Sequence, residues 1–272
     1  MNPPNQKPIY KVSSSFLTQY QGCSKRIQRE VVERLESNSG VTSIEQLFGS
    51  ALHSFREHYV RFDYFKAMDH AIGMFNQGMS NIYSIADKKA FLNEEYLRSV
   101  CNTYAALAPN RTEIDGLSVC FNGNDNTPLV EEYFSIPVIE TSEFELHLSG
   151  KIDAIGIIGR HLVIEDIKTT SQSRTEMFFE RFKYSPQMRI YAYVIDKLTE
   201  VLGEESPIGE LRLKNKDFAV SIHACFLSKT KTTFERSNLI TYSKEETTEF
   251  ASILEKQLLK IASQIQDGAY AK

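Results

Sequence analysis

This chain of 272 residues lacks several features that mark other protein classes. It contains no tryptophan, and an enzyme that stacks sugar rings on aromatic side chains usually has that residue in its site. Its four cysteines show no close pairing, which fits neither a disulfide framework nor a zinc site built from two Cys-x-x-Cys pairs. We therefore expect a protein of the reducing cytosol. The cysteines are Cys23, Cys101, Cys120 and Cys225.

Long apolar runs and an excess of positive charge are also missing. No run approaches the roughly 20 residues that a membrane-spanning helix needs, and the polar start at Met1–Lys7 is not that of a targeting segment. We expect an unprocessed, soluble protein with no membrane partner. The net charge of −4 gives no overall attraction for nucleic acid, so any nucleic-acid surface must be a local concentration of Lys and Arg.

The pattern of apolar and turn residues predicts a helical region over residues 1–115 and a core with strands over 116–272, together one compact domain. Ser13–Ser15 are predicted to cap a helix that runs to about residue 36, and Thr42–Glu45 form a capping-box pattern for a second helix. The fold class is therefore α/β, more narrowly α+β, with a mixed β-sheet flanked by helices. Strands are expected at about 129–138, 143–149, 150–158, 161–169, 217–227 and 233–241, and helices at about 186–203 and from Ser243 onward.

One predicted hairpin, Gly150–Thr169, carries most of the chemical information. Its turn is Gly159-Arg160, and glycine suits the first central position of a two-residue type II′ turn. Counting back from this turn places Asp153 directly opposite Asp166. At an effective dielectric near 20, two charges about 5 Å apart repel by roughly 3 kcal/mol, so a fold that keeps this pair is expected to use it.

A divalent cation between the two carboxylates would turn their repulsion into coordination, because hard oxygen ligands suit Mg²⁺ or Mn²⁺. The two-residue repeat of a strand places Asp166 and Lys168 on one face and Glu165 on the other. A lysine beside a metal and a scissile phosphate can orient the attacking water and offset charge on phosphorus. The hairpin alone leaves an alternative open: both aspartates can be solvent-facing residues of an ordinary amphipathic hairpin, since the register can slip by one residue.

Further motifs stand in a fixed order around this hairpin. Their sequence resembles the PD-(D/E)xK nuclease superfamily, and within it the RecB-like branch, which includes recombination exonucleases and the nucleases of CRISPR spacer acquisition. The resemblance extends from about residue 13 to the last predicted helix, and it implies a restriction-endonuclease-like fold. The motifs that carry it are Ser13–Arg26, Gly49–His53, Val130-Glu131, Asp153, Asp166-Ile167-Lys168 and Gln187–Tyr191.

The resemblance also implies roles for single residues. Asp153, Asp166, His53 and the carbonyl of Ile167 would hold one or two Mg²⁺ or Mn²⁺ ions, with Glu131 assisting. Gln187 and Tyr191 lie at positions i and i+4 of a helix, and in the family they help to hold DNA and to order the catalytic lysine. The residues expected to act in catalysis are Asp153, Asp166, Lys168, Gln187 and Tyr191.

One departure from the family concerns iron. Many RecB-like nucleases bind an iron–sulfur cluster through an amino-terminal cysteine and three cysteines near the carboxyl end. This sequence has Cys23 but no such trio before Lys272, so no cluster is expected unless residues have been removed from the end. Cys23 is then a remnant of the motif or a plain buried thiol.

The predicted activity is metal-dependent DNA hydrolysis, with an exonuclease expected in recombination, repair or the processing of phage and mobile-element DNA. Single-stranded DNA or duplex ends would be the substrate, and a recombination or replication protein is an expected partner. A bacterial or phage-encoded protein acting in the cytoplasm is expected. Two alternatives remain: a catalytically inactive relative that binds nucleic acid or protein, and a glycoside hydrolase that uses the paired carboxylates. Candidate phosphate contacts are Lys25, Arg26, Arg181, Lys183 and Arg189.

Overall fold

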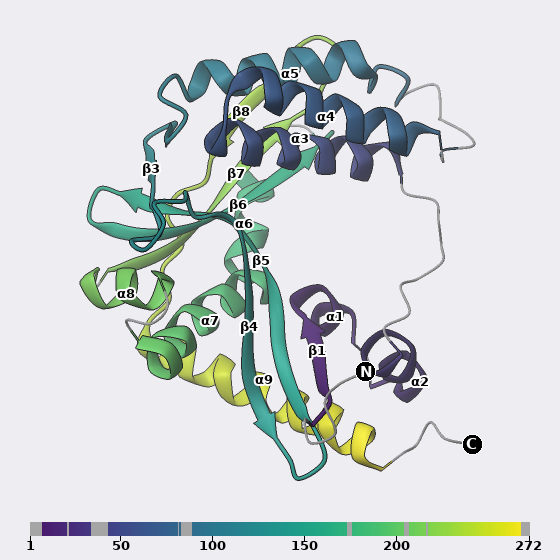
Figure 1. The fold of residues 1–272 in the computed structure, drawn as a ribbon, viewed down its shortest axis with the longest axis vertical. Helices are drawn as coiled ribbons and strands as arrows, with labels where there is room; N and C mark the ends of the chain where they lie inside the picture. The colour runs from purple at the N-terminus through teal and green to yellow at the C-terminus, as the bar shows by residue number, and fades with distance from the viewer. Residues whose placement is uncertain are drawn as a thin grey trace.

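The computed structural model describes residues 7–20, 22–33, 43–80, 82, 89–172, 176–203, 207–215 and 217–267. Within these segments the chain forms a mixed eight-stranded sheet with helices on both faces (Figure 1). The predicted mixed α/β fold class is confirmed. The strands are β1 (Ile9–Ser13), β2 (Glu113–Ile114), β3 (Leu117–Val119), β4 (Val130–Glu140), β5 (Glu145–Ile158), β6 (His161–Thr170), β7 (Phe218–Phe226) and β8 (Thr233–Arg236).

Strand β5 is the centre of this sheet. Its carboxyl-terminal half pairs with β3 and β6 in the order β2-β3-β5-β6-β7-β8, and its amino-terminal half pairs with β1 and β4. The β1–β5 and β6–β7 pairs are parallel and the other described pairs are antiparallel. In Figure 1, β4 and β5 extend well beyond the rest of the sheet, with β1 beside them.

Two hydrophobic cores form on opposite faces of the sheet. One contains apolar side chains of α1, α6, α7 and α9 and the other those of α3, α4 and α5, as Figure 1 shows by their places around the strands. None of the helices in the described segments has the length and apolar character needed to cross a membrane. The helices are α1 (Ser14–Gln19), α2 (Ser24–Ile27), the π-helix η1 (Gln28–Val32), α3 (Ile44–Arg61), α4 (Tyr64–Met79), α5 (Glu94–Leu107), α6 (Glu176–Lys183), α7 (Pro186–Leu202), α8 (Pro207–Lys214) and α9 (Lys244–Gln266).

Local signals at the helix ends account for several of these boundaries. Ser243 and Glu246 form both hydrogen bonds of a capping box, as predicted for the last helix. At α3 the box is one residue later than predicted, because Ser43 is the cap and Gln46 its partner. The first helix was expected to be continuous, but it ends at Gln19, and Gly22 with φ +80° turns the chain before α2 begins.

The strand boundaries also correct the prediction. The expected break at Gly150 does not occur, because this glycine lies within β5, where a Cβ atom would stand 2.7 Å from Cζ of Phe134. Glycine here allows an aromatic ring to lie on the strand. The strand expected at 233–241 ends at Arg236, and only an isolated bridge between Ile240 and Val220 follows it. The short β2, β3 and α8 were not predicted.

Candidate metal centre and catalytic site

The predicted hairpin forms with the predicted register at its turn. Gly159 has φ +60° and Arg160 has no positive φ, as a type II′ turn requires. Ile158 faces His161, and the antiparallel ladder continues to the pair Ala154 and Glu165.

The ladder ends one pair before the two aspartates, so the predicted face-to-face pair of Asp153 and Asp166 is wrong in detail. Oδ2 of Asp153 instead accepts a hydrogen bond of 2.7 Å from the backbone N–H of Ile167. Ile152 and Ile155 lie in the same core although they are three positions apart, so the alternation of sides along β5 is broken at Asp153. Before Asp153, β5 pairs with β4 and β1, while β6 pairs with β7 after Asp166.

Glu131 lies on β4 between the residues that pair with Ala154 and Ile152, at the level where β5 and β6 part. Its φ of +55° places it in the left-handed region, which costs a side chain with a Cβ atom about 1–3 kcal/mol. Such strain persists where the surrounding structure holds the residue in place, and it gathers at functional sites. Here it accompanies an inward-turned carboxylate, whose side chain is only 7% exposed.

His53, Glu131 and Asp153 form the first of two groups of polar side chains at this point. One ligand atom from each lies within 4.8 Å of the others. Nδ1 of His53 is 3.2 Å from Oε1 of Glu131 and 3.6 Å from Oδ2 of Asp153. Nζ of Lys151 is 2.8 Å from the second carboxylate oxygen of Glu131. Sequence reasoning missed Lys151, although it lies only two residues before Asp153 on the same strand.

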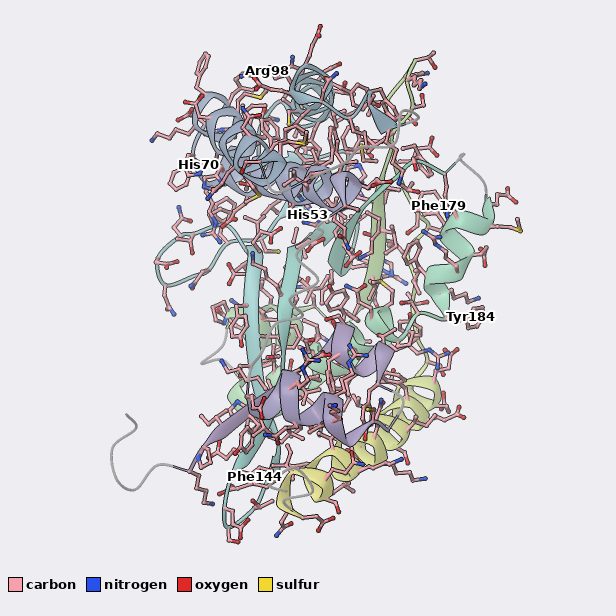
Figure 2. All side chains as sticks on the ribbon, turned by 90° about the vertical axis from the view of Figure 1, so that its right-hand side faces the viewer. His53, His70, Arg98, Phe144, Phe179 and Tyr184 are labelled. Atoms are coloured by element: carbon pink, nitrogen blue, oxygen red, sulfur yellow. The ribbon has the colours of Figure 1, made fainter. Side chains whose placement is uncertain are left out.

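The histidine reaches this group because α3 packs closely on β6. A Cβ atom at Gly49 would stand 2.8 Å from Oγ1 of Thr169, so only glycine permits this approach. Two turns further along α3, the guanidinium of Arg56 lies 2.7 Å from the carboxylate of Glu165, and both side chains are fully buried. These two contacts hold His53 over the strands, where Figure 2 shows it.

Asp166 is the centre of the second group. Its Oδ1 accepts hydrogen bonds from Nε2 of Gln187 at 2.9 Å and from the hydroxyl of Tyr191 at 3.1 Å. Its Oδ2 is 2.7 Å from Nζ of Lys168, and that ammonium also donates to Oε1 of Gln187 at 3.2 Å. Glu165 points to the opposite face, into the core that contains α3. The hydrogen bond between Ile167 and Asp153 connects the second group to the first.

Burial and neighbouring charges shift the ionisation of the first group. Burial, together with the negative charges of Asp166 and Glu131, raises the pKa of Asp153 to about 6, against the opposing effect of His53. Burial alone would lower the pKa of His53, but the carboxylates of Asp153 and Glu131 raise it overall. A proton is therefore favoured at this group while no cation neutralises its charge.

Both groups border one cleft of 1360 Å³ between α3, α4, the start of β4, the middle of β5 and the end of β6. Glu131, Lys151 and His53 line it from one side and Lys168 with Ile167 from another. A ligand in the cleft can therefore contact both groups.

Comparison with known proteins agrees with this arrangement. The sequence profile of the PD-(D/E)XK nuclease superfamily matches residues 11–272. The chain belongs to this superfamily. No curated protein sequence matches the chain.

Two solved structures share a general likeness with this PD-(D/E)XK protein. One, named "Putative exonuclease", is from Eubacterium rectale; it is 12% identical, with 93% of this chain and 80% of that chain covered and a TM-score of 0.46. The other, named SSO0001, is 11% identical, with 90% of this chain and 85% of that chain covered and a TM-score of 0.30.

PD-(D/E)XK nucleases use divalent metals, and the donor set here fits such an ion. Three side chains offer carboxylate oxygens and an imidazole nitrogen within a short distance of one another. Oxygen donors suit Mg²⁺ and Mn²⁺, and an imidazole is better tolerated by Mn²⁺. A bound cation would offset the negative charge that helps to raise the pKa of Asp153, and the strained backbone of Glu131 already directs its carboxylate to this point.

The five predicted phosphate contacts of this PD-(D/E)XK protein do not gather at the cleft. Lys25 is exposed on α2, and Arg26 forms an ion pair with Glu30 at 2.7 Å. Arg189 lies over the rings of Tyr242 and Phe250 on the side of α7 that packs on α9. Their role in DNA binding remains a prediction.

The remaining two, on α6, lie elsewhere as well. Arg181 stacks on the rings of Phe178 and Phe182, and its guanidinium donates to Gln172. Lys183 lines a different hollow, between α6 and the segment that follows β8. Cys23 is exposed, so it is not the buried thiol that one interpretation of the sequence suggested.

Proposed function

We propose that this PD-(D/E)XK protein is a divalent-metal-dependent nuclease that hydrolyses phosphodiester bonds of DNA. The observation that carries the proposal is the meeting of two polar groups where β5 and β6 part, connected by the hydrogen bond from Ile167 to Asp153. The predicted PD-(D/E)XK signature, Asp153 and Asp166-Ile167-Lys168, then lies at one edge of the cleft.

Each group has a distinct role in this proposal. His53, Glu131, Asp153 and Asp166, with the carbonyl of Ile167, would hold Mg²⁺ or Mn²⁺. When bound, the cation supplies Lewis-acid polarisation of the scissile phosphate and lowers the pKa of a coordinated water.

Lys168 provides the positive charge beside the phosphate. Asp166 and Gln187 hold its ammonium from two directions, so its position is set before substrate binds. An ammonium fixed in this way orients the attacking water and stabilises the charge that grows on the phosphoryl oxygens. Tyr191 acts as a positioning residue, because its hydroxyl donates to Asp166 and accepts from Gln187.

The biological setting is proposed from the resemblance of the sequence motifs rather than from the geometry. The sequence motifs favour an exonuclease of recombination, repair or mobile-element DNA processing. It would act in the cytoplasm with a recombination or replication protein as partner.

Labelled linear and circular DNA, single- and double-stranded, incubated with Mg²⁺, Mn²⁺ or EDTA, tests both levels of the proposal. We expect linear DNA to be cleaved, circular DNA to stay intact, and EDTA to stop the cleavage. Cleavage of circles would replace the exonuclease with an endonuclease. No cleavage of any DNA with either metal, together with no heat of Mn²⁺ binding in calorimetry, would contradict the proposal and favour a catalytically inactive binding protein.

A further inference from the structure

The part of the sheet where β4, β5 and β1 extend beyond the other strands has a polar face beside the metal centre. Where β4, β5 and β1 pair, Phe134, Ile136, Leu146 and Leu148 point into the core, and the residues between them point to the other side. We call that other side the strand face. It includes Lys11, Tyr133, Ser135, Glu145, His147, Ser149 and Lys151.

The strand face is continuous with the cleft. Tyr133 pairs with Lys151 across β4 and β5, and Lys151 both lines the cleft and contacts Glu131. From Lys151 the face continues along β5 to His147, whose partner on β1 is Lys11. The four residue steps from Lys151 to His147 span about 13 Å. Figure 2 shows β4 and β5 running from the level of His53 toward Phe144 at their far end.

Three side chains on this face have the chemistry that nucleic acid needs. The ring of Tyr133 is 57% exposed. Nζ of Lys11 donates to its neutral hydroxyl at 3.0 Å, rather than to a carboxylate, and lies 5.1 Å from the ring centre. The side chain of Lys151 is 54% exposed, and its partner Glu131 is one of the candidate metal ligands. A cation held by Glu131 would compete with Lys151 for that carboxylate and leave the ammonium available to a phosphate.

We propose that the strand face is the track along which a single strand of nucleic acid runs to or from the metal centre, with a base stacked on Tyr133 and phosphates at Lys11 and Lys151. The inference deepens the proposed nuclease function and rests on it. A single strand is favoured over a duplex because only unpaired bases offer a free face to an aromatic ring. Two lysines and an exposed ring on a sheet are a sequence-tolerant way to bind such a strand.

Ser135, His147 and Glu145 raise another interpretation, that of a nucleophilic triad. The hydroxyl of Ser135 is 3.0 Å from Nδ1 of His147, and Nε2 of the same ring is 2.9 Å from the carboxylate of Glu145. A triad also needs free N–H groups that stabilise an oxyanion. Here the neighbouring backbone takes part in the β4–β5 ladder, and none of the described cavities opens at these residues. The contacts therefore order the strand face and do not form a second active site.

Fluorescence anisotropy with a labelled oligo(dT) of about 15 nucleotides in EDTA tests the inference without hydrolysis. Tyr133→Leu should weaken binding about tenfold, while Tyr133→Phe, which keeps the ring, should bind within about twofold of the wild type. Lys11→Ala should reduce the slope of log K against log salt by about 0.7, the value for one phosphate contact on a single strand. Matched controls are Tyr184→Leu and Lys256→Ala, whose side chains are exposed on α6's carboxyl-terminal side and on α9.

Two outcomes would overturn the track. One is binding of Tyr133→Leu and Lys11→Ala within about twofold of the wild type; if Tyr184→Leu is then the weak binder, the strand runs past α6 instead. The other is equal competition by a duplex of the same length. Hydrolysis of bis(p-nitrophenyl) phosphate by the wild type with Mn²⁺ reports the metal centre separately. If the wild type hydrolyses this ester and the Tyr133→Leu and Lys11→Ala variants bind oligo(dT) as the wild type does, the track alone is refuted. If the wild type hydrolyses neither this ester nor DNA, the proposed function is refuted.

Discussion

Asp166 shows how one residue can be fixed by its neighbours before any ligand is present. Three groups contact its two oxygens: the Gln187 amide, the Tyr191 hydroxyl and the Lys168 ammonium. The whole residue is 1% exposed. Because contacts to both oxygens fix this carboxylate, the Lys168 ammonium that it holds is fixed as well. Loss of Lys168 should therefore affect the chemical step most selectively.

Lys168→Ala should lower the rate of DNA cleavage by a factor of about 10²–10³, because a fixed positive charge beside the phosphate is lost. The affinity of this variant for Mn²⁺ should fall little or rise, since Lys168 contributes no ligand and the positive charge of its side chain repels a cation. Single-turnover cleavage and calorimetry measure the two quantities. Lys231→Ala, an exposed lysine after β7, is the control. A parallel loss of metal binding would mean that Lys168 supports the fold of the site and not the reaction.

The ionisation of Asp153 and His53 predicts a pH dependence of metal binding. The pKa of Asp153 is raised to about 6 and that of His53 is raised as well, so both groups gain protons as the pH falls through that range. A metal needs both groups deprotonated, so competition with the proton on Asp153 costs about tenfold in apparent affinity between pH 7 and pH 5, and His53 adds to this loss. Mn²⁺ titrations at several pH values in two buffers count the released protons. An affinity that stays constant from pH 7 to pH 5 would show that neither residue is a ligand.

At the scale of elements, the contact of α3 with β6 decides whether His53 reaches the strands. Gly49→Ala should destabilise the protein by about 1–3 kcal/mol, because the added methyl group meets Oγ1 of Thr169. Gly49→Ala combined with Thr169→Ala should recover most of that loss. Urea unfolding and Mn²⁺ affinity are the measurements. Gly73→Ala on α4 is a matched control with open space around it and should raise stability by about 0.5–1 kcal/mol. Equal losses for the single and double variants would contradict this packing.

A buried ionic cluster also joins α3, β6 and β8. Glu165 is fully buried and accepts from Arg56 at 2.7 Å and from Arg236 at 2.6 Å. Burial alone would raise the pKa of Glu165, but His223, Arg56 and Arg236 hold it far below its ordinary value. This contribution to stability is therefore present above the unfolded value of 4.5 and is lost only as the pH falls far into the acid range.

Glu165→Gln should lower the free energy of unfolding by about 3–5 kcal/mol at pH 7, because it leaves two guanidinium groups in the interior without their carboxylate. Urea denaturation checks the value. Glu94→Gln removes an exposed ion pair with Arg98, which solvent screens, and should leave the free energy of unfolding almost unchanged. If the two substitutions cost the same, the cluster does not lock α3 to the sheet.

At the scale of the whole molecule, the site depends on segments that are distant in the chain. His53 comes from the helical layer on one face, Gln187 and Tyr191 from α7 on the other face, and the carboxylates from strands between them. A cation that binds only the folded arrangement must therefore stabilise all of it.

Mn²⁺ at about 100 times its dissociation constant should raise the stability of the wild-type protein by about 2.7 kcal/mol. Thermal unfolding with Mn²⁺ and with EDTA measures this. Asp153→Asn should lose most of the stabilisation, while Lys256→Ala should keep it. Equal stabilisation of wild type and Asp153→Asn would place the cation elsewhere.

The sequence alone was sufficient for features that depend on neighbouring residues. The glycine at position 159 determined the turn, the turn determined the register as far as Ala154 and Glu165, and the two-residue repeat separated Asp166 from Glu165. The capping box at Ser243 and the superfamily motifs are local in the same sense. The predicted domain boundary near residue 115 stays a prediction.

Other features needed the tertiary structure. The parting of β5 and β6 arises because β5 turns to β4 and β1 while β6 pairs with β7, and residues far apart in the chain make those pairs. The left-handed backbone of Glu131 and the close approach of Gly49 to Thr169 also depend on what surrounds them. Local patterns determined which side chains carry the chemistry, whereas long-range packing decided which of them meet, because the distance between two groups is set by every element that lies between them.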